Sequence, residues 1–207
     1  MPSIVVFGDS IAHGGRDMEH GGWPLRLRRH MRQHDLGDAL WVQARSGDTS
    51  FNLRRRLPIE IGLRPAETVL IAIGTNDAQV LMDADHPRVS DGEYADNLSF
   101  CITTAKQHAR WVIPIAPTQV AASPRPGPRP ILPQRIQALG DMVAQVAVAH
   151  GCWWLDLRQV LDDSCRPDGI HPDTAGHARM AAAVWQGLLP TGCLGERAKE
   201  IPALAHQ

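Results

Sequence analysis

Cysteine is scarce in this 207-residue chain, and no two cysteines form a C-x-x-C pair. Their wide and irregular spacing argues against a zinc site and a disulfide framework, and favours reduced thiols at Cys101, Cys152, Cys165 and Cys193. A chain of this length buries enough apolar surface to fold without metal or cross-links. We therefore expect no metal and no disulfide to be needed for the fold.

Long hydrophobic runs and an excess of one charge are also missing. Nowhere do about 18 apolar residues follow one another, the minimum for a membrane-spanning helix. The formal net charge of −1 gives no general attraction to nucleic acid or to anionic membranes. The start of the chain has neither a charged segment nor a long apolar segment of the secretory kind. We expect a cytoplasmic protein without a nucleic-acid partner, although a processed secreted form would have the same sequence.

Short β-branched runs alternate with longer amphipathic ones, and we find no internal repeat. This alternation predicts an α/β fold with a parallel sheet. In the third of these runs, residues 69–73, the side chains that point to either face are all apolar, as in a central strand covered on both faces. The predicted strands are Ile4–Phe7, Leu40–Gln43, Val69–Ile73, Trp111–Ile115 and Trp153–Leu155.

Helices are predicted between these strands. In the first of them Trp23, Leu27 and Met31 recur at helical spacing, and Pro24 suits a first helical turn. The last predicted helix, which begins at residue 174, has Asp173 at its N-cap. Further helices are expected over residues 50–57, 91–109, 132–150 and 174–188.

The chain is predicted to form one domain over residues 1–190, followed by a loosely held tail over residues 191–207 that has no periodic apolar stripe. Residues 116–133 hold six of the sixteen prolines. So many prolines exclude a helix, and we expect an ordered surface loop there.

Small polar residues follow the ends of the predicted strands. Ser10 follows the first strand, Gly47 the second, Asn76 the third, and the pair Asp168 and His171 lies beyond the fifth. Parallel strands end at the same edge of a sheet, where ligands bind, so these residues are expected to meet there. Together they offer a nucleophile, oxyanion donors, and a base with a carboxylate to orient it.

Each of these residues alone has a simpler structural explanation. Ser10 is more often a helix N-cap, Gly47 a turn residue, and Asn76 a turn or cap residue. Asp168 and His171 are common loop residues. Their joint placement at one sheet edge is what favours an active site.

With these residues in view, the chain resembles the SGNH hydrolases, also called the GDSL esterase/lipase family. Four blocks occur in order: FGDSI at 7–11, SGDTS at 46–50, GTND at 74–77 and DGIHP at 168–172. They span most of the domain and omit the tail. No G-x-S-x-G occurs, which argues against the nucleophile elbow of the α/β-hydrolase arrangement.

The resemblance implies a role for each matching position. Ser10 would be the nucleophile, His171 the base and Asp168 its orienter, and the oxyanion hole would comprise the Ser10 N–H, the Gly47 N–H and the Asn76 amide. Glycine at position 47 would let the backbone approach the oxyanion without a Cβ in the way. One departure is that family members often carry Asn near the end of the second strand, where this chain has Val42-Gln43-Ala44.

We expect a flavodoxin-like three-layer α/β/α sandwich whose five parallel strands have the order 2-1-3-4-5. The expected function is a cofactor-independent serine esterase acting on a small or short-acyl ester, with acetyl, lysophospholipid and thioester substrates all open. No metal is expected, because His30 and His34 share a helix face without a third ligand. The sequence does not indicate the oligomeric state.

Three alternatives stay open. The same triad serves an acyltransferase if an alcohol replaces water in the second step. A Gly-rich loop at a helix N-terminus also suits a flavin- or phosphate-binding module. A catalytically inactive relative that binds sugars or partners is the third.

Overall fold

The computed structural model describes residues 1–17, 19–80, 86–121 and 130–204. Its five strands form one sheet, in which every pair is parallel and the order is β2-β1-β3-β4-β5. The predicted fold class and strand order are therefore confirmed. The strands are β1 (Ile4–Gly8), β2 (Leu40–Ala44), β3 (Thr68–Ala72), β4 (Trp111–Ala116) and β5 (Leu155–Asp156).

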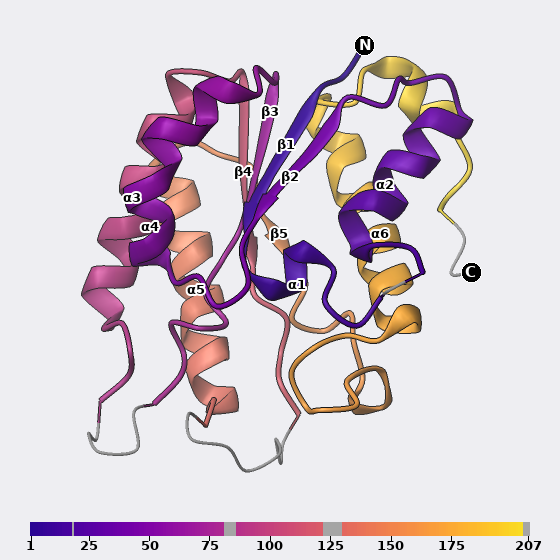
Figure 1. Ribbon diagram of the computed structural model, residues 1–207. Helices are drawn as coiled ribbons and strands as arrows, with labels where there is room; N and C mark the ends of the chain where they lie inside the picture. Colours follow the sequence, from indigo (N-terminus) through magenta and orange to yellow (C-terminus); the bar gives the residue numbers. More distant parts are fainter. Residues whose placement is uncertain (18, 81–85, 122–129, 205–207) are drawn as a thin grey trace.

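Helices cover both faces of the sheet (Figure 1). One layer comprises α3 (Ser50–Glu60), α4 (Asp91–Lys106) and α5 (Pro133–Ala149), and the other comprises α2 (Gly22–Gln33) and α6 (Thr174–Leu188). The short α1 (Ser10–His13) begins directly after β1. Single 3₁₀ turns lie at Ile61–Leu63, Asp163–Cys165, Leu189–Thr191 and Glu196–Glu200.

Each face of the sheet carries its own hydrophobic core. Trp23, Leu27 and Met31 of α2 are fully buried on one face, as their helical spacing predicts. Tyr94 of α4 is fully buried on the other face. Side chains of β1 alternate between the two cores, with Ile4 and Val6 in the first and Val5 and Phe7 in the second. The central strand β3 is covered in the same way, with Leu70 in the first core and Val69 and Ile71 in the second.

The helix starts are fixed by side-chain caps at the edge where the strands end. Thr49 and Ser90 each form a reciprocal capping box with the residue at the third helical position of α3 and α4. Asp173 accepts a hydrogen bond of 2.8 Å from the Gly176 N–H at the start of α6, as predicted. These caps hold the loops that lie next to the predicted site residues.

The structure differs from the predictions at two places. The fifth strand covers only Leu155–Asp156, and Trp153, which was assigned to it, is half exposed. Beyond Pro190, where a loose tail was expected, Cys193, Leu194 and Ala198 are buried against the core of the α2 and α6 face. The segment packs through single side chains in and between two short 3₁₀ turns, which leave no periodic stripe in the sequence.

The predicted surface loop over residues 116–133 lies partly outside the described residues, which omit 122–129. In the part of the chain that the structure describes, no helix has the length and hydropathy to cross a membrane.

Candidate active site

The turn after β1 places Ser10 at the first position of α1. A Cβ on Gly8 would lie 2.5 Å from the Ala72 carbonyl oxygen, so only glycine fits between β1 and β3 here. Asp9 caps α1 by accepting a hydrogen bond of 2.9 Å from the Ile11 N–H. The Ser10 N–H then belongs to the first helical turn, where backbone N–H groups have no acceptor within the helix. Ser10 thus presents a hydroxyl and an N–H from one rigid position.

The structure brings Ser10, His171 and Asp168 together in a chain of hydrogen bonds. The Ser10 Oγ lies 2.9 Å from the His171 Nε2, and the His171 Nδ1 lies 2.8 Å from the Asp168 Oδ2. Ser10 comes from the end of β1, and the other two come from the loop before α6. Residues 161 positions apart in the sequence therefore adopt the geometry of a Ser-His-Asp triad.

Asp168 is held as a carboxylate. Partial burial acts to raise its pKa, but hydrogen bonds from the His171 side chain and from the His171 and Ile170 N–H groups outweigh burial and hold the pKa below its ordinary value. A carboxylate can only accept, so the His171 Nδ1 carries the proton. The Nε2 lone pair is then free to accept the Ser10 hydroxyl proton, as a general base must.

Gly47 and Asn76 lie in the loops after β2 and β3. The Asn76 Nδ2 donates a hydrogen bond of 2.9 Å to the Asp48 carbonyl oxygen, which ties the two loops together. Gln79 donates to the Asn76 Oδ1 at 3.2 Å and fixes the amide from the other side. An amide nitrogen has two hydrogens, so Asn76 keeps a second donor for a ligand.

The backbone conformation at position 47 also favours glycine. A Cβ built at Gly47 would meet no atom within 4 Å, so the free structure shows no crowding there. Its φ of +83°, however, lies in the left-handed region that side chains disfavour. The backbone conformation, and through it the direction of the Gly47 N–H, is what needs glycine.

The loop after β2 is supported by Arg56, a residue that the sequence analysis did not single out. Its guanidinium donates to the Asp48 carboxylate at 2.7 Å and to the Gln43 carbonyl oxygen at 2.9 Å, and it contacts the Gly8 carbonyl oxygen at 3.3 Å. Glu60, one turn further along α3, pairs with the same guanidinium at 2.5 Å. Arg56 thus joins the ends of β1 and β2.

Two buried carboxyl groups, Asp9 and Asp77, lie beneath the site. Burial raises the pKa of each to about 6, and their mutual repulsion adds to the shift of Asp9. Asp77 accepts hydrogen bonds of 2.9 and 3.0 Å from the Ser50 N–H, so it anchors the start of α3 rather than reaching the triad. Asp9 accepts from Ile11, as described above.

The guanidinium of Arg16 bonds to Asp168, a contact that could not be predicted from the sequence. An arginine in a polar loop carries no signal of its partner, and neither Arg16 nor Arg56 belongs to one of the four sequence blocks.

His30 and His34 lie in contact at the end of α2, and His30 belongs to the buried face of that helix. His30 is buried, its ring lies 4.5 Å from the Trp185 ring and 4.6 Å from the His34 ring, and burial lowers its pKa. Over residues 1–17, 19–80, 86–121 and 130–204, no group of three His, Cys, Asp or Glu side chains could hold a metal ion.

Comparison with known proteins places this geometry in a family. The model of the GDSL-like lipase/acylhydrolase family matches residues 6–179. No curated protein matches the chain.

Solved structures of similar fold cover nearly the whole chain. LAE5, an alpha/beta hydrolase enzyme from the metagenome of Lake Arreo, Spain, is 26% identical with a TM-score of 0.74, over 94% of this chain and 97% of that one. Axe2, an acetylxylan esterase from Geobacillus stearothermophilus, is 22% identical with a TM-score of 0.73, over 90% of this chain and 94% of that one. The chain belongs to the GDSL-like lipase/acylhydrolase family and is a serine hydrolase that acts on esters.

Proposed function

We propose that this protein hydrolyses short-acyl esters, acetyl esters above all, through an acyl-enzyme on Ser10. The observation that carries the proposal is the continuous chain from the Ser10 Oγ through His171 to the Asp168 carboxylate. A serine hydroxyl is a weak nucleophile unless a base removes its proton, and this chain supplies the base in the required tautomer.

In the first step the Ser10 Oγ attacks the ester carbonyl carbon while His171 takes the hydroxyl proton. The carbonyl oxygen becomes negatively charged and accepts hydrogen bonds from the N–H groups of Ser10 and Gly47 and from the Asn76 amide. His171 then returns the proton to the departing alcohol, which leaves the acyl group on Ser10. A water molecule, deprotonated by His171, attacks the acyl-enzyme and restores the free serine.

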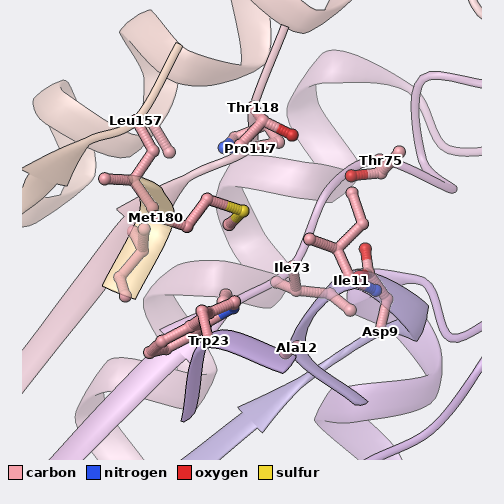
Figure 2. Close-up of a pocket in the computed structure, with 13 residues that line it drawn as sticks. Asp9, Ile11, Ala12, Trp23, Ile73, Thr75, Pro117, Thr118, Leu157 and Met180 are labelled. Atoms are coloured by element: carbon pink, nitrogen blue, oxygen red, sulfur yellow. Dashed lines mark hydrogen bonds between the residues drawn. The ribbon is translucent and has the colours of Figure 1, made fainter. Parts of the chain in front are cut away.

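A small, mostly apolar cavity, lined by both chain neighbours of Ser10, supports a short acyl group (Figure 2). Asp9 and Ile11, which flank Ser10 in the chain, both line it, together with Pro117, Leu157 and Met180. Its volume is about 20 Å³, which is room for about one water-sized group such as a methyl. We assign this cavity to the acyl methyl of an acetyl ester.

The partner in this reaction is a small-molecule ester, and the chemistry needs no cofactor or metal. An acyltransferase would use the same residues, with an alcohol in place of water in the second step. Product analysis with an added alcohol distinguishes the two: transfer gives a new ester, whereas hydrolysis releases only the acid.

The proposal is tested by labelling and by a substrate screen. An organophosphonate should add one label, located by mass spectrometry on the peptide that contains Ser10, and p-nitrophenyl acetate should be hydrolysed faster than longer acyl esters. Ser10→Ala should lose the label and lower kcat by roughly three orders of magnitude or more.

Ser99→Ala is the matched control for this test. The Ser99 Oγ lies 2.7 Å from the His150 Nε2, a serine–histidine contact on the α4 and α5 face. Among the described residues, no carboxylate forms an ion pair with His150. This variant should keep both the label and the activity. A label on Ser99, or an active preparation that takes up no label at Ser10, would contradict the proposal.

A further inference from the structure

Arg16 extends the triad by one residue. Its Nε and Nη2 both lie 2.9 Å from the Asp168 Oδ2. This is the same oxygen that accepts the His171 Nδ1–H at 2.8 Å. The chain of contacts therefore runs from Ser10 through His171 and Asp168 to a permanent positive charge.

The loop holds Arg16 in a conformation that a side chain rarely adopts. Its φ is +72°, in the left-handed region, and such strain persists only where the surroundings enforce it. On one side, the Gly15 N–H donates to the Ser10 carbonyl oxygen at 3.1 Å. On the other, the Asp17 carboxylate is fully buried and accepts from the Gly22 N–H at 3.1 Å and from Arg26 at 2.9 Å. Both neighbours of Arg16 are thus fixed in place.

A buried histidine on α6 anchors the same loop. The Trp23 N–H can only donate, so the His177 Nδ1, 3.3 Å away, is an acceptor and the Nε2 carries the proton. The His177 Nε2–H accordingly donates to the Gly15 carbonyl oxygen at 3.0 Å. Burial lowers the pKa of His177 and keeps the ring in this neutral form. Because the loop of Asp168 leads directly into α6, this helix holds both partners of the Arg16–Asp168 contact.

We propose that Arg16 is a positioning residue of the triad, which fixes the Asp168 carboxylate and offsets part of its charge. This inference rests on the proposed esterase function. Removing the Arg16 charge should therefore strengthen the attraction between the Asp168 carboxylate and a protonated His171 ring. The charged groups that face His171 are Asp168 on its own loop, Arg16 on the α1–α2 loop, and the buried Asp9 after β1.

Arg16→Gln should expose this effect. Without the positive charge, His171 should take up its proton at higher pH, and the acid limb of kcat/KM should move up by about half to one pH unit. Because the Arg16 side chain is 48% exposed, the shift should be largest at low ionic strength and shrink in high salt. The plateau of kcat should fall several-fold, with little change in KM, because the carboxylate loses the hydrogen bond and the ion pair that orient it.

Further variants separate charge from geometry and from folding. Arg16→Lys keeps the positive charge but loses the planar guanidinium. The acid limb of its pH profile should therefore lie where it does in the parent protein, whereas kcat should recover only in part. Arg16→Gly removes the strain at φ +72° and should fold at least as stably as the parent protein while showing the same shifted limb. The matched control is Arg179→Gln, which removes an arginine of similar exposure that pairs with Asp162.

Two readouts keep this inference separate from the proposed function. NMR follows the protonation of His171 directly, with the signal assigned by its loss in His171→Gln, and does not depend on any substrate. A shifted His171 titration in Arg16→Gln supports the inference even if no ester is turned over, in which case the proposed function alone fails. If the His171 titration and the pH profile of Arg16→Gln both match those of Arg179→Gln, Arg16 is a surface ion pair and the inference is wrong.

Discussion

Asn76 donates its side-chain N–H to the carbonyl oxygen of Asp48 at 2.9 Å, so one amide joins the loops after β2 and β3. The bond uses one of the two amide hydrogens. The other is available to a developing oxyanion, so Asn76 serves both the loops and the reaction in our proposal. Its substitution should therefore affect stability and rate separately.

We expect Asn76→Ala to lower kcat by about 10²- to 10³-fold with little change in KM, because the oxyanion contact strengthens only as charge develops. The lost loop contact should cost about 1 kcal/mol of stability. Steady-state kinetics on p-nitrophenyl acetate and a thermal melt measure the two effects. Gln79→Ala, which keeps the Asn76 amide but removes its 3.2 Å support, should show a much smaller loss of kcat. A lower melting temperature with kcat within threefold of the parent would make Asn76 purely structural.

The contact of Ser10 with His171, and the contact between the loops after β2 and β3, could be predicted because parallel topology sends every strand end to one edge. The strands were recognisable from short apolar runs, and a residue's distance from the strand end then limits where it lies. Ser10 and His171 are far apart in the sequence. Each could nevertheless be placed at this edge of the sheet once the strand that precedes it was identified.

Arg16 and Arg56 could not be predicted in this way. Each has a long side chain whose partners come from other elements: Asp168 for Arg16, and the ends of β1 and β2 for Arg56. Loop conformation decides these contacts, and no pattern of spacing encodes it. The packed segment beyond Pro190 escaped prediction for a related reason, since single buried side chains such as Leu194 and Ala198 give no period.

The size of the cavity beside Ser10 should set the acyl preference. Met180 is 3% exposed and lines this cavity, so Met180→Ala should enlarge it and raise the ratio of butyrate to acetate hydrolysis several-fold. The truncation should also cost about 2–5 kcal/mol of stability. Assays of p-nitrophenyl esters from acetate to octanoate, at a temperature where both proteins are folded, measure the change.

Met142→Ala is the control for this prediction, because Met142 packs against the core on the opposite face of the sheet. It should lower stability without changing the order of substrates. If Met180→Ala keeps the acyl preference of the parent protein, the acyl group binds elsewhere.

Arg56 should be needed for the oxyanion loop. Arg56→Met leaves the half-buried Asp48 carboxylate without this partner and leaves the buried Glu60 paired with the exposed Arg45, which should cost about 3–5 kcal/mol of stability. The loop that carries Gly47 should also lose its fixed conformation, and kcat should fall at temperatures well below the melting transition. Arg54→Met removes another arginine of α3, one that bonds to Asn97 instead, and should leave kcat unchanged. Equal kcat values for the two variants would show that Arg56 supports the fold alone.

Asp9 should make the protein less stable as the pH rises. Its pKa is about 6 in the folded state, because burial disfavours the charge, against 3.8 for an exposed aspartate. Between these two pH values the folded protein holds a proton that the unfolded chain has released. The favourable contribution of this group is therefore fully present below pH 3.8 and is lost as the pH rises through about 6.

Asp9→Asn removes the buried charge and keeps an oxygen that can accept from the Ile11 N–H. We therefore expect its stability relative to the parent protein to increase between pH 5 and pH 8, by about 1–3 kcal/mol. Urea unfolding of both proteins at the two pH values measures this difference. Asp162→Asn is the matched control: hydrogen bonds from Ser164 and Arg179 hold the pKa of Asp162 below its ordinary value, so that group is charged in both states over this range. The effect of Asp162→Asn on stability should be the same at pH 5 and pH 8. If the effect of Asp9→Asn were equally constant, burying the charged form of Asp9 would cost the folded protein no stability.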